Sequence, residues 1–214
     1  MPALEIPSLV GFNSKVFDIG HYQSMNPTGN TGFIQTLNRS SPTWFAEYGT
    51  PGLIGERYNE TRSFLDLLEG SMNPFLGFDP RRPMPYAYRT LSTSATPWGT
   101  APKITAQDYA NSLITIADTT VGAVITKGDY ISVQVNNIWY LFRVQENWVS
   151  LGTPFSIVVK PRPNIAGLVG NEPIRYRKAC IEMKMIGGVE ESDSVDDLPA
   201  FRFRAAQFTR RADI

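Results

Sequence analysis

The sequence predicts a mainly β protein that carries one α-helix and has a small β-barrel or sandwich inserted into a larger domain. Glycine and proline, at 17 and 16 of 214 residues, are scattered along the chain, which indicates many turns and therefore many short strands. Residues 55–69 have the three- and four-residue apolar spacing of a helix. Residues 98–163 concentrate short alternating segments between two proline-rich ends, which is typical of an inserted β module.

The helix is expected at residues 55–69, because its apolar side chains form one stripe along a helical surface. Gly70 is well placed as the C′ residue, where a left-handed conformation ends a helix at little cost. A single helix of this length is marginal in water, so we expect it to pack on a sheet. The stripe consists of Tyr58, Thr61, Phe64, Leu65 and Leu68.

The inserted domain is expected at residues 98–163, with residues 1–97 and 164–214 forming the other domain. Residues 97–102 and 160–163 are rich in proline and are interpreted as linkers. Asn136 and Asn137 both tolerate a positive φ and predict a two-residue hairpin turn. The expected strands of this domain are 113–116, 123–126, 130–135, 138–144 and 155–159.

The outer domain shows weaker patterns. We expect strands at 16–19 and 32–37, with a polar loop at 21–32 that contains His21, the single histidine. Residues 174–186 are expected to form one long strand, with a bulge or a change of burial near Lys178. Residues 190–197 carry five acidic side chains and are interpreted as a mobile loop, followed by a strand that places Phe201, Phe203 and Ala205 on one face.

The composition argues against several classes of protein. Lys plus Arg equals Asp plus Glu at 20 each, so the chain lacks the positive excess that a protein built to bind nucleic acid needs. No run approaches the roughly 18 apolar residues of a membrane-spanning helix. The first residues have no basic or long apolar region of a signal peptide, so we expect synthesis in a cytoplasm and no membrane insertion.

No motif predicts catalysis, a cofactor or a metal site. Cys180 is the single cysteine, so no internal disulfide forms, and it is interpreted as a buried strand residue. One histidine and one cysteine do not supply the ligands of a zinc site, and the spacing of an EF-hand is absent. A glycan hydrolase remains an alternative, with Glu56 and Glu60, or Asp66 and Asp79, as its nominal carboxylate pairs.

Charged residues cluster in a way that favours self-assembly. Complementary patches on a chain of zero net charge allow basic strand faces of one copy to meet acidic loops of the next. The alternative is that these side chains form ordinary solvated faces. The candidate interface residues are Arg81, Arg82, Arg175, Arg177, Arg202, Arg204, Glu190 and Glu191.

Three tryptophans lie in or beside the inserted domain, at Trp98, Trp139 and Trp148. Exposed aromatic rings on a β module can stack on sugar rings, so these residues are candidate glycan contacts. Packing in the core is the competing interpretation. A carbohydrate-binding module is therefore an alternative function.

Two blocks of the sequence stand in a distinctive order. The first begins at Trp44, continues through the helix end at 64–70 (FLDLLEG) and a short aromatic strand, and closes with prolines up to Pro85. The second contains 128–133 (GDYISV) and 139–144 (WYLFRV).

The second block ends at 160–163 (KPRP), and the chain closes with 198–208 (LPAFRFRAAQF). In this order the blocks resemble the distal tail, or baseplate hub, proteins at the tail tip of tailed bacteriophages and gene transfer agents. The resemblance covers most of residues 40–208. It resides in the order of the blocks, since each motif alone is common among β proteins.

The resemblance implies both a fold and a role. Residues 1–97 and 164–214 would form a β-sandwich or split barrel carrying the helix, and the insertion would be an OB-like or galectin-like β-barrel. Six copies would close a ring around the tail channel, as a structural part of the virion. The ring would join the tail tube protein to central hub or fibre proteins.

Overall fold

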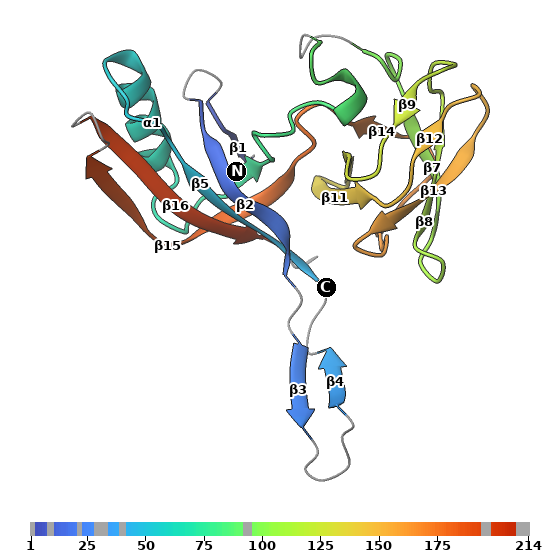
Figure 1. Cartoon of the computed structure of the whole chain (residues 1–214), viewed down its shortest axis with the longest axis horizontal. Coiled ribbons are helices and arrows are strands. Elements are labelled where there is room, and N and C mark those ends of the chain that lie inside the picture. Colours follow the sequence, from blue (N-terminus) through green and yellow to red (C-terminus); the bar gives the residue numbers. More distant parts are fainter. Residues whose placement is uncertain are drawn as a thin grey trace.

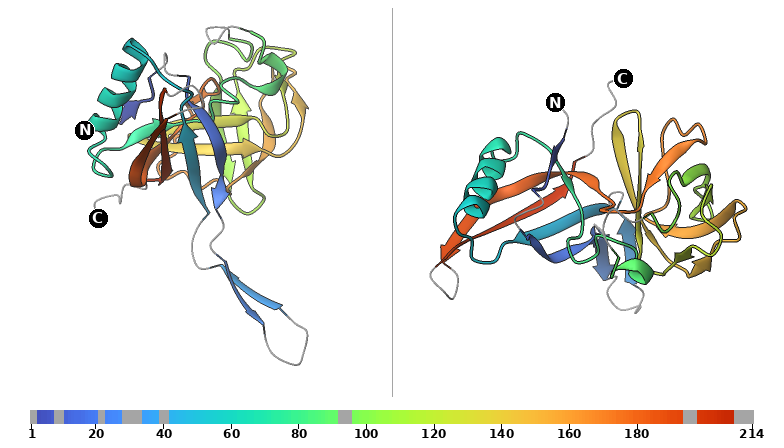
Figure 2. Two further views of the ribbon diagram at one scale, coloured as in Figure 1. Left: turned by 60° about the vertical axis from the view of Figure 1, so that its left-hand side comes forward. Right: turned by 90° about the horizontal axis from the view of Figure 1, so that it is seen from above.

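The computed structural model describes residues 3–7, 11–20, 23–27, 34–38, 42–91, 96–193 and 198–208. A curled six-stranded sheet and a closed six-stranded barrel lie side by side, with one α-helix on the sheet (Figures 1 and 2). The prediction of a mainly β protein with one helix and a small barrel is confirmed. The OB-like or galectin-like type of the barrel stays a prediction.

The curled sheet has the strand order β1-β6-β15-β16-β5-β2. All its pairings are antiparallel except that of β1 with β6. Its strands are β1 Leu4–Glu5, β2 Asn13–Gly20, β5 Thr43–Gly49, β6 Phe75–Gly77, β15 Ile181–Asp193 and β16 Pro199–Gln207.

The barrel has the order β10-β11-β13-β8-β7-β14, and β14 pairs with β10 to close it. A short ribbon of β9 (Val124–Ile125) and β12 (Trp148–Val149) accompanies it. The barrel strands are β7 Lys103–Asp108, β8 Leu113–Ala117, β10 Tyr130–Val135, β11 Ile138–Val144, β13 Phe155–Lys160 and β14 Glu172–Arg175.

The β10–β11 hairpin follows its predicted pattern. Ile131, Val133 and Val135 all lie in the barrel core. Asn136 and Asn137 have φ values of 51° and 61°, as the predicted two-residue turn requires.

Two expectations about the limits of the barrel need correction. Its closing strand β14 lies after residue 163, where the inserted domain was expected to end. Residues 97–102 are not simply an exposed linker, because Trp98 is fully buried and stacks on Tyr176 with 4.7 Å between ring centroids. The barrel core is therefore completed by residues on both sides of the predicted insertion.

The expected long strand at 174–186 is two strands in different sheets. β14 closes the barrel, and β15 begins at Ile181 in the curled sheet. Lys178 lies between them with φ 45°, so the direction of the chain changes where the sequence pattern shifts phase. We call residues 176–180 the crossover.

Helix α1 (Glu56–Leu67) packs its predicted stripe on the curled sheet. Thr61, Phe64, Leu65 and Leu68 are buried, and Tyr58 packs against Phe201 with 5.5 Å between ring centroids. The helix end differs from the prediction in one position. Leu68 is the C-cap, and the left-handed conformation starts at Glu69 (φ 46°) and continues at Gly70 (φ 68°).

Two segments expected to be loops contain strands. β3 (Gln23–Pro27) lies within the predicted loop 21–32 and pairs with β4 (Ile34–Asn38). This hairpin connects β2 to β5 and projects away from the sheet and the barrel (Figure 1). Residues 190–193 belong to β15 and pair with β16, whereas 194–197 and His21 lie outside the described residues. A 3₁₀ turn, η1 (Tyr86–Tyr88), lies between β6 and the barrel.

Candidate assembly surfaces

The sheet and the barrel share a buried aromatic seam. The indole N–H of Trp44 on β5 donates to the carbonyl of Leu141 on β11 at 3.1 Å, and the Trp44 side chain is fully buried. The rings of Phe17 on β2 and Tyr130 on β10 have centroids 5.7 Å apart, and each contacts Trp44. Tyr130 and Leu141 thus belong to the core of the curled sheet although their strands form the barrel.

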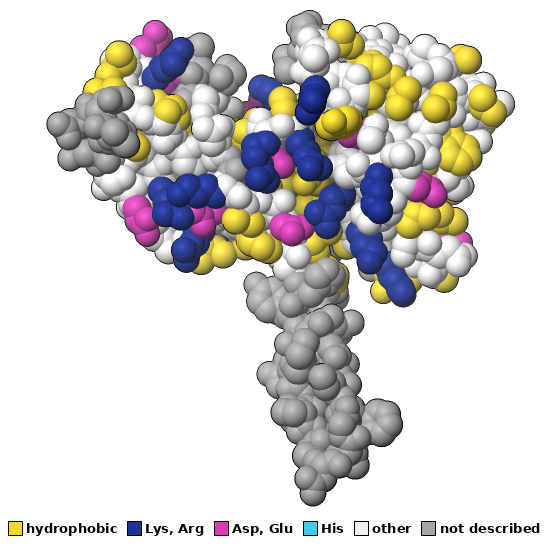
Figure 3. All heavy atoms as spheres, in the orientation of Figure 1, with side chains coloured by type: hydrophobic (Ala, Val, Ile, Leu, Met, Phe, Trp, Pro, Cys, Tyr) yellow, Lys and Arg dark blue, Asp and Glu magenta, His cyan; other side chains and the backbone are white. Residues whose placement is uncertain are grey.

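Arg81 and Arg82, two predicted interface residues, bind within the chain at this seam. Arg81 Nε lies 3.1 Å from the buried Asp79 carboxylate, whose hydrogen bonds raise the pKa of Arg81. Arg82 Nη1 donates to the carbonyl of Gly128 at 3.1 Å, which ties the segment after β6 to the barrel. Lys and Arg side chains gather over the junction on this face (Figure 3). Both arginines therefore have a structural role in one copy.

A second contact across the seam uses the buried carboxylate of Asp129. Its two oxygens accept the backbone N–H of Tyr86 at 2.7 Å and that of Thr126 at 2.8 Å. Burial raises the pKa of Asp129 in spite of these hydrogen bonds. The carboxyl group therefore links η1 to the barrel, and the protonated form is favoured more than in the unfolded chain.

We expect Asp129→Ala to cost about 1–3 kcal/mol of unfolding free energy, because two buried amide groups lose their acceptor. Since the folded-state pKa is raised, the contribution of Asp129 is fully present below its ordinary pKa of 3.8 and declines as the pH rises through the raised value. Urea unfolding of the original chain and of Asp129→Ala, each at pH 4 and pH 7, measures the difference in unfolding free energy at the two pH values. The loss should be larger at pH 4, and an equal or smaller loss there would contradict the assignment.

Arg202 and Arg204 face outward from β16, as predicted, and meet an acid on the adjacent strand. Glu47 of β5 forms an ion pair with Arg202 and lies 3.7 Å from Arg204 Nε. The hydrogen bond from Arg202 lowers the pKa of Glu47. These two arginines are thus paired within the sheet.

The acidic residues at the end of β15 are exposed. Glu191 accepts hydrogen bonds from Arg62 Nη1 at 3.1 Å and from the hydroxyl of Tyr58 at 3.3 Å, both on α1. Glu190 lies opposite Arg202 in the β15–β16 register. Helix α1 therefore holds this end of β15 in place, while both carboxylates stay at the surface.

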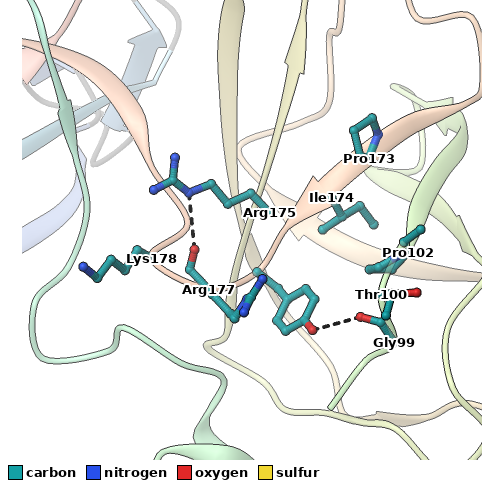
Figure 4. A pocket seen from close by; sticks show the side chains of 10 residues that line it. Gly99, Thr100, Pro102, Pro173, Ile174, Arg175, Arg177 and Lys178 are labelled. Atoms are coloured by element: carbon teal, nitrogen blue, oxygen red, sulfur yellow. Dashed lines mark hydrogen bonds between the residues drawn. The ribbon is translucent and has the colours of Figure 1, made fainter. Parts of the chain in front are cut away.

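Arg175 and Arg177, the remaining predicted basic residues, line a cavity of about 460 Å³ at the crossover. We call it the cationic pocket; residues 99–102 form one wall and residues 173–178 the other (Figure 4). The hydroxyl of Tyr176 donates to the carbonyl of Gly99 at 3.2 Å and joins the two walls. Lys178 adds a third cation, and no acidic residue lines the pocket.

The three cations of the pocket are positioned by aromatic rings. The Arg175 guanidinium lies 5.5 Å from the Trp139 ring, and that of Arg177 lies 5.9 Å from the Tyr176 ring. Lys178 Nζ lies 5.6 Å from the ring of Phe78. Sequence reasoning missed Lys178 as a site residue, although the change of phase at this position was visible.

The three candidate tryptophans have different environments. Trp98 has no exposed surface, so the prediction of a glycan contact there is wrong. Trp148 is 36% exposed, but its ring stacks on Phe155 at 5.4 Å. Trp139 is half-buried beside Arg175. Trp98 therefore cannot share an exposed aromatic surface with the other two.

Of the four carboxylates considered for a hydrolase, Asp66 and Asp79 belong to separate ion pairs. Asp66 lies 3.4 Å from Arg62 on the surface of α1, and Asp79 is buried beside Arg81. Glu56 and Glu60 lie on α1, where Glu56 is exposed and Glu60 half-buried.

One end of the barrel exposes an apolar surface without charges. Val121, Val149 and Leu151 are 71%, 54% and 74% exposed, and Trp148 lies next to Val149 in the chain. Neither 119–126 nor 148–154 contains a charged residue. A contiguous surface of this kind is typical of a protein–protein contact.

The curled sheet ends in unpaired strand edges. β2 is its last strand, and no strand among the described residues pairs with its outer edge. β6 covers only 181–183 of the 13-residue β15, so the rest of that edge has no partner strand in the described part of the chain. Within the described part of the chain, β3 and β4 pair only with each other. Such edges can accept a strand from another chain.

The described residues provide no group of three or more His, Cys, Asp and Glu side chains that could hold a metal ion. Burial raises the pKa of the Cys180 thiol to about 11, so the nucleophilic thiolate is disfavoured at neutral pH. Among the same residues, α1 and η1 are both too short or too polar to cross a membrane.

A scan against models of protein families gives no match, and a search of curated protein sequences gives none either.

Proposed function

We propose that this chain is a structural subunit of a phage tail tip, which forms a ring adaptor between the tail tube and the central hub or fibres. The resemblance of the two sequence blocks to distal tail proteins supports the tail-tip role. The mainly β fold, with a curled sheet and a separate small barrel, is compatible with it.

The observation that carries the assembly part of the proposal is the β3–β4 hairpin. It projects from the body, and among the described residues its strands pair only with each other (Figure 1). An isolated two-stranded hairpin is at best marginally stable in water, so a surface on another chain would stabilise it. A hairpin placed in this way serves as an arm that reaches a neighbouring subunit.

The unpaired edges of the curled sheet provide a route to a closed ring. β2 and the uncovered part of β15 lie toward opposite sides of the sheet, so one copy can present β2 to β15 of the next. A contact between two different surfaces is heterologous, and it forms a ring when its rotation closes. Six copies are the number that the resemblance implies.

The experiment that tests this proposal is electron microscopy of the purified chain and of the assembled particle, combined with native mass spectrometry. We expect closed rings of six copies, and density for this chain at the end of the tail. A chain that stays monomeric at high concentration, and that is absent from the tail, would contradict the proposal.

The structure favours this role over a carbohydrate-binding module. Of the three tryptophans that motivated that alternative, Trp98 is buried and Trp148 is stacked on Phe155. The exposed apolar end of the barrel is better suited to a protein partner, since its side chains provide few hydrogen-bonding groups for a sugar.

A further inference from the structure

We propose that the β3–β4 hairpin of one copy docks on the apolar end of the barrel of a second copy. This inference rests on the ring proposed above and names the surface that receives the arm. We call the largely exposed side chains of Val121, Val149 and Leu151 the apolar tip.

The apolar tip is a fixed surface made by two turns of the barrel. The backbone N–H of Gly122 donates to the carbonyl of Ser150, and that of Ser150 donates to the carbonyl of Ala123, both at 2.8 Å. The hydroxyl groups of Ser150 and Thr119 are buried and lie 2.6 Å apart. These polar groups bind one another, so a partner gains mainly by covering the apolar side chains of the tip.

The hairpin suits this surface because neither of them carries charge. Residues 19–38 form the longest run of the chain without Asp, Glu, Lys or Arg, and β3 and β4 lie within it. The two turns of the tip, 119–126 and 148–154, also lack charged residues. The cores of protein–protein interfaces are depleted in charged residues, since moving a charge out of water is costly. Contact between the hairpin and the tip involves no such cost for the residues of either segment.

Other surfaces of the described chain are less suitable for an uncharged arm. A groove of about 300 Å³ between α1 and β15 is lined by Arg62, Asp66 and Glu191. The curled sheet carries the ion pair of Arg202 with Glu47. Covering either surface would remove paired charges from water. The apolar tip is therefore the surface that an uncharged hairpin covers at the least cost.

The register of the hairpin places apolar residues on one face of its ribbon. Pro27 lies opposite Ile34, and Met25 lies opposite Thr36. Positions two apart along a strand share a face, so Met25, Pro27 and Ile34 belong to the same face. Two strands alone cannot bury either face of their ribbon, so this face needs a neighbouring surface to cover it.

The hairpin and the apolar tip of one chain lie far apart. In Figure 1 the hairpin projects downward from the body, whereas β9 and β12, which belong to the two turns of the tip, lie at the upper right. The contact must therefore join two copies. Each copy offers one hairpin and one tip, so the contact is heterologous, as a ring requires.

Two variants of the whole chain test the contact by complementation, followed by sedimentation velocity. The tip variant Val121→Asp/Leu151→Asp keeps the hairpin, and a shortened chain with an Asn-Gly turn in place of residues 21–42 keeps the tip. Each alone should stay monomeric at concentrations at which the original chain assembles. Their mixture should form a dimer and nothing larger, because the pair has one intact hairpin and one intact tip. No dimer in the mixture would contradict the proposed contact.

The matched control is Ile54→Asp/Val169→Asp. These two aliphatic side chains are also largely exposed, but they lie outside the two turns of the tip. The control should assemble like the original chain. Thermal unfolding verifies that both double variants fold; if the tip variant does not, Leu151→Asp alone replaces it, with Val169→Asp as its control. Equal assembly of the tip and control variants would overturn the inference and assign the tip to a different partner.

Cross-linking locates the contact. A mixture of Thr36→Cys and Leu151→Cys chains, treated with a short thiol cross-linker, should yield a linked dimer. The single native cysteine, Cys180, has no exposed surface, so the original chain should give no product. A product from Leu151→Cys alone would show that two tips meet each other, and it would overturn the assignment of the hairpin.

The same measurements separate this contact from the ring. Closed rings of unchanged stability in the tip variant would overturn the contact and leave the ring proposal standing. A dimer in the complementation mixture, together with open chains of the original protein in place of closed rings, would support the contact and contradict the ring.

Discussion

Replacing Trp44 with alanine is expected to lower the unfolding free energy by about 3–5 kcal/mol, the range found when a large aromatic side chain is removed from a core. Trp44 has no exposed surface and contacts both Phe17 and Tyr130. The variant also removes the indole N–H, so the carbonyl of Leu141 loses this hydrogen-bond donor. Because these contacts join the sheet to the barrel, the variant should also loosen their attachment.

Urea unfolding measures this loss of unfolding free energy when it is monitored by two signals, far-ultraviolet circular dichroism and tryptophan fluorescence. The two signals should coincide in the original chain and separate in Trp44→Ala if the barrel unfolds independently of the sheet. Trp148→Ala is the matched control, since Trp148 is 36% exposed and lies away from the seam. A smaller loss for Trp44→Ala than for Trp148→Ala would contradict the central position of Trp44.

Local periodicity was sufficient to predict those elements whose structure is determined by residues close together in the sequence. The stripe of α1 and the alternation in β10 follow from spacing along the chain, and the Asn136–Asn137 turn follows from the conformations that asparagine tolerates. The shared face of Phe201, Phe203 and Ala205 was also correct, because alternate residues of a strand point to the same face and all three lie in the core.

The crossover could not be predicted from the sequence. Its position depends on which part of residues 174–186 joins the barrel and which part joins the curled sheet. Ile174 lies in the barrel core and Ile181 in that of the curled sheet, although the sequence between them reads as one strand. Trp98 was missed for a related reason. Prolines around it indicated a linker, and its partner Tyr176 lies far along the chain.

The types of residue at the candidate surfaces could be predicted from the sequence, whereas the partner of each charged side chain could not. Sequence reasoning identified the arginines, but the acid that binds Arg202 is Glu47, on a strand distant in sequence. Lys178 joins Arg175 and Arg177 only because the chain turns at the crossover. Long-range strand order decides such contacts, and a single sequence gives little information about it.

Removing the β3–β4 hairpin is expected to abolish assembly while the fold persists. Gly20 and Thr43 are register partners at the ends of β2 and β5, so a two-residue Asn-Gly turn can replace residues 21–42. No described strand of the curled sheet pairs with β3 or β4, so their removal takes no described strand pairing from that sheet. We expect the unfolding free energy to change by no more than about 1 kcal/mol, the range of substitutions away from the core.

Sedimentation velocity and electron microscopy measure the effect on assembly. If the hairpin is the arm that binds a neighbour, the shortened chain should sediment as a monomer at concentrations where the full chain forms rings. It should still accept the arm of a full-length copy, because the surface that receives the arm is intact. A mixture of the two chains should therefore yield open, incomplete assemblies, since each shortened copy ends a growing arc. Closed rings formed by the shortened chain alone would show that the hairpin has another role and that the edges of β2 and β15 suffice for assembly.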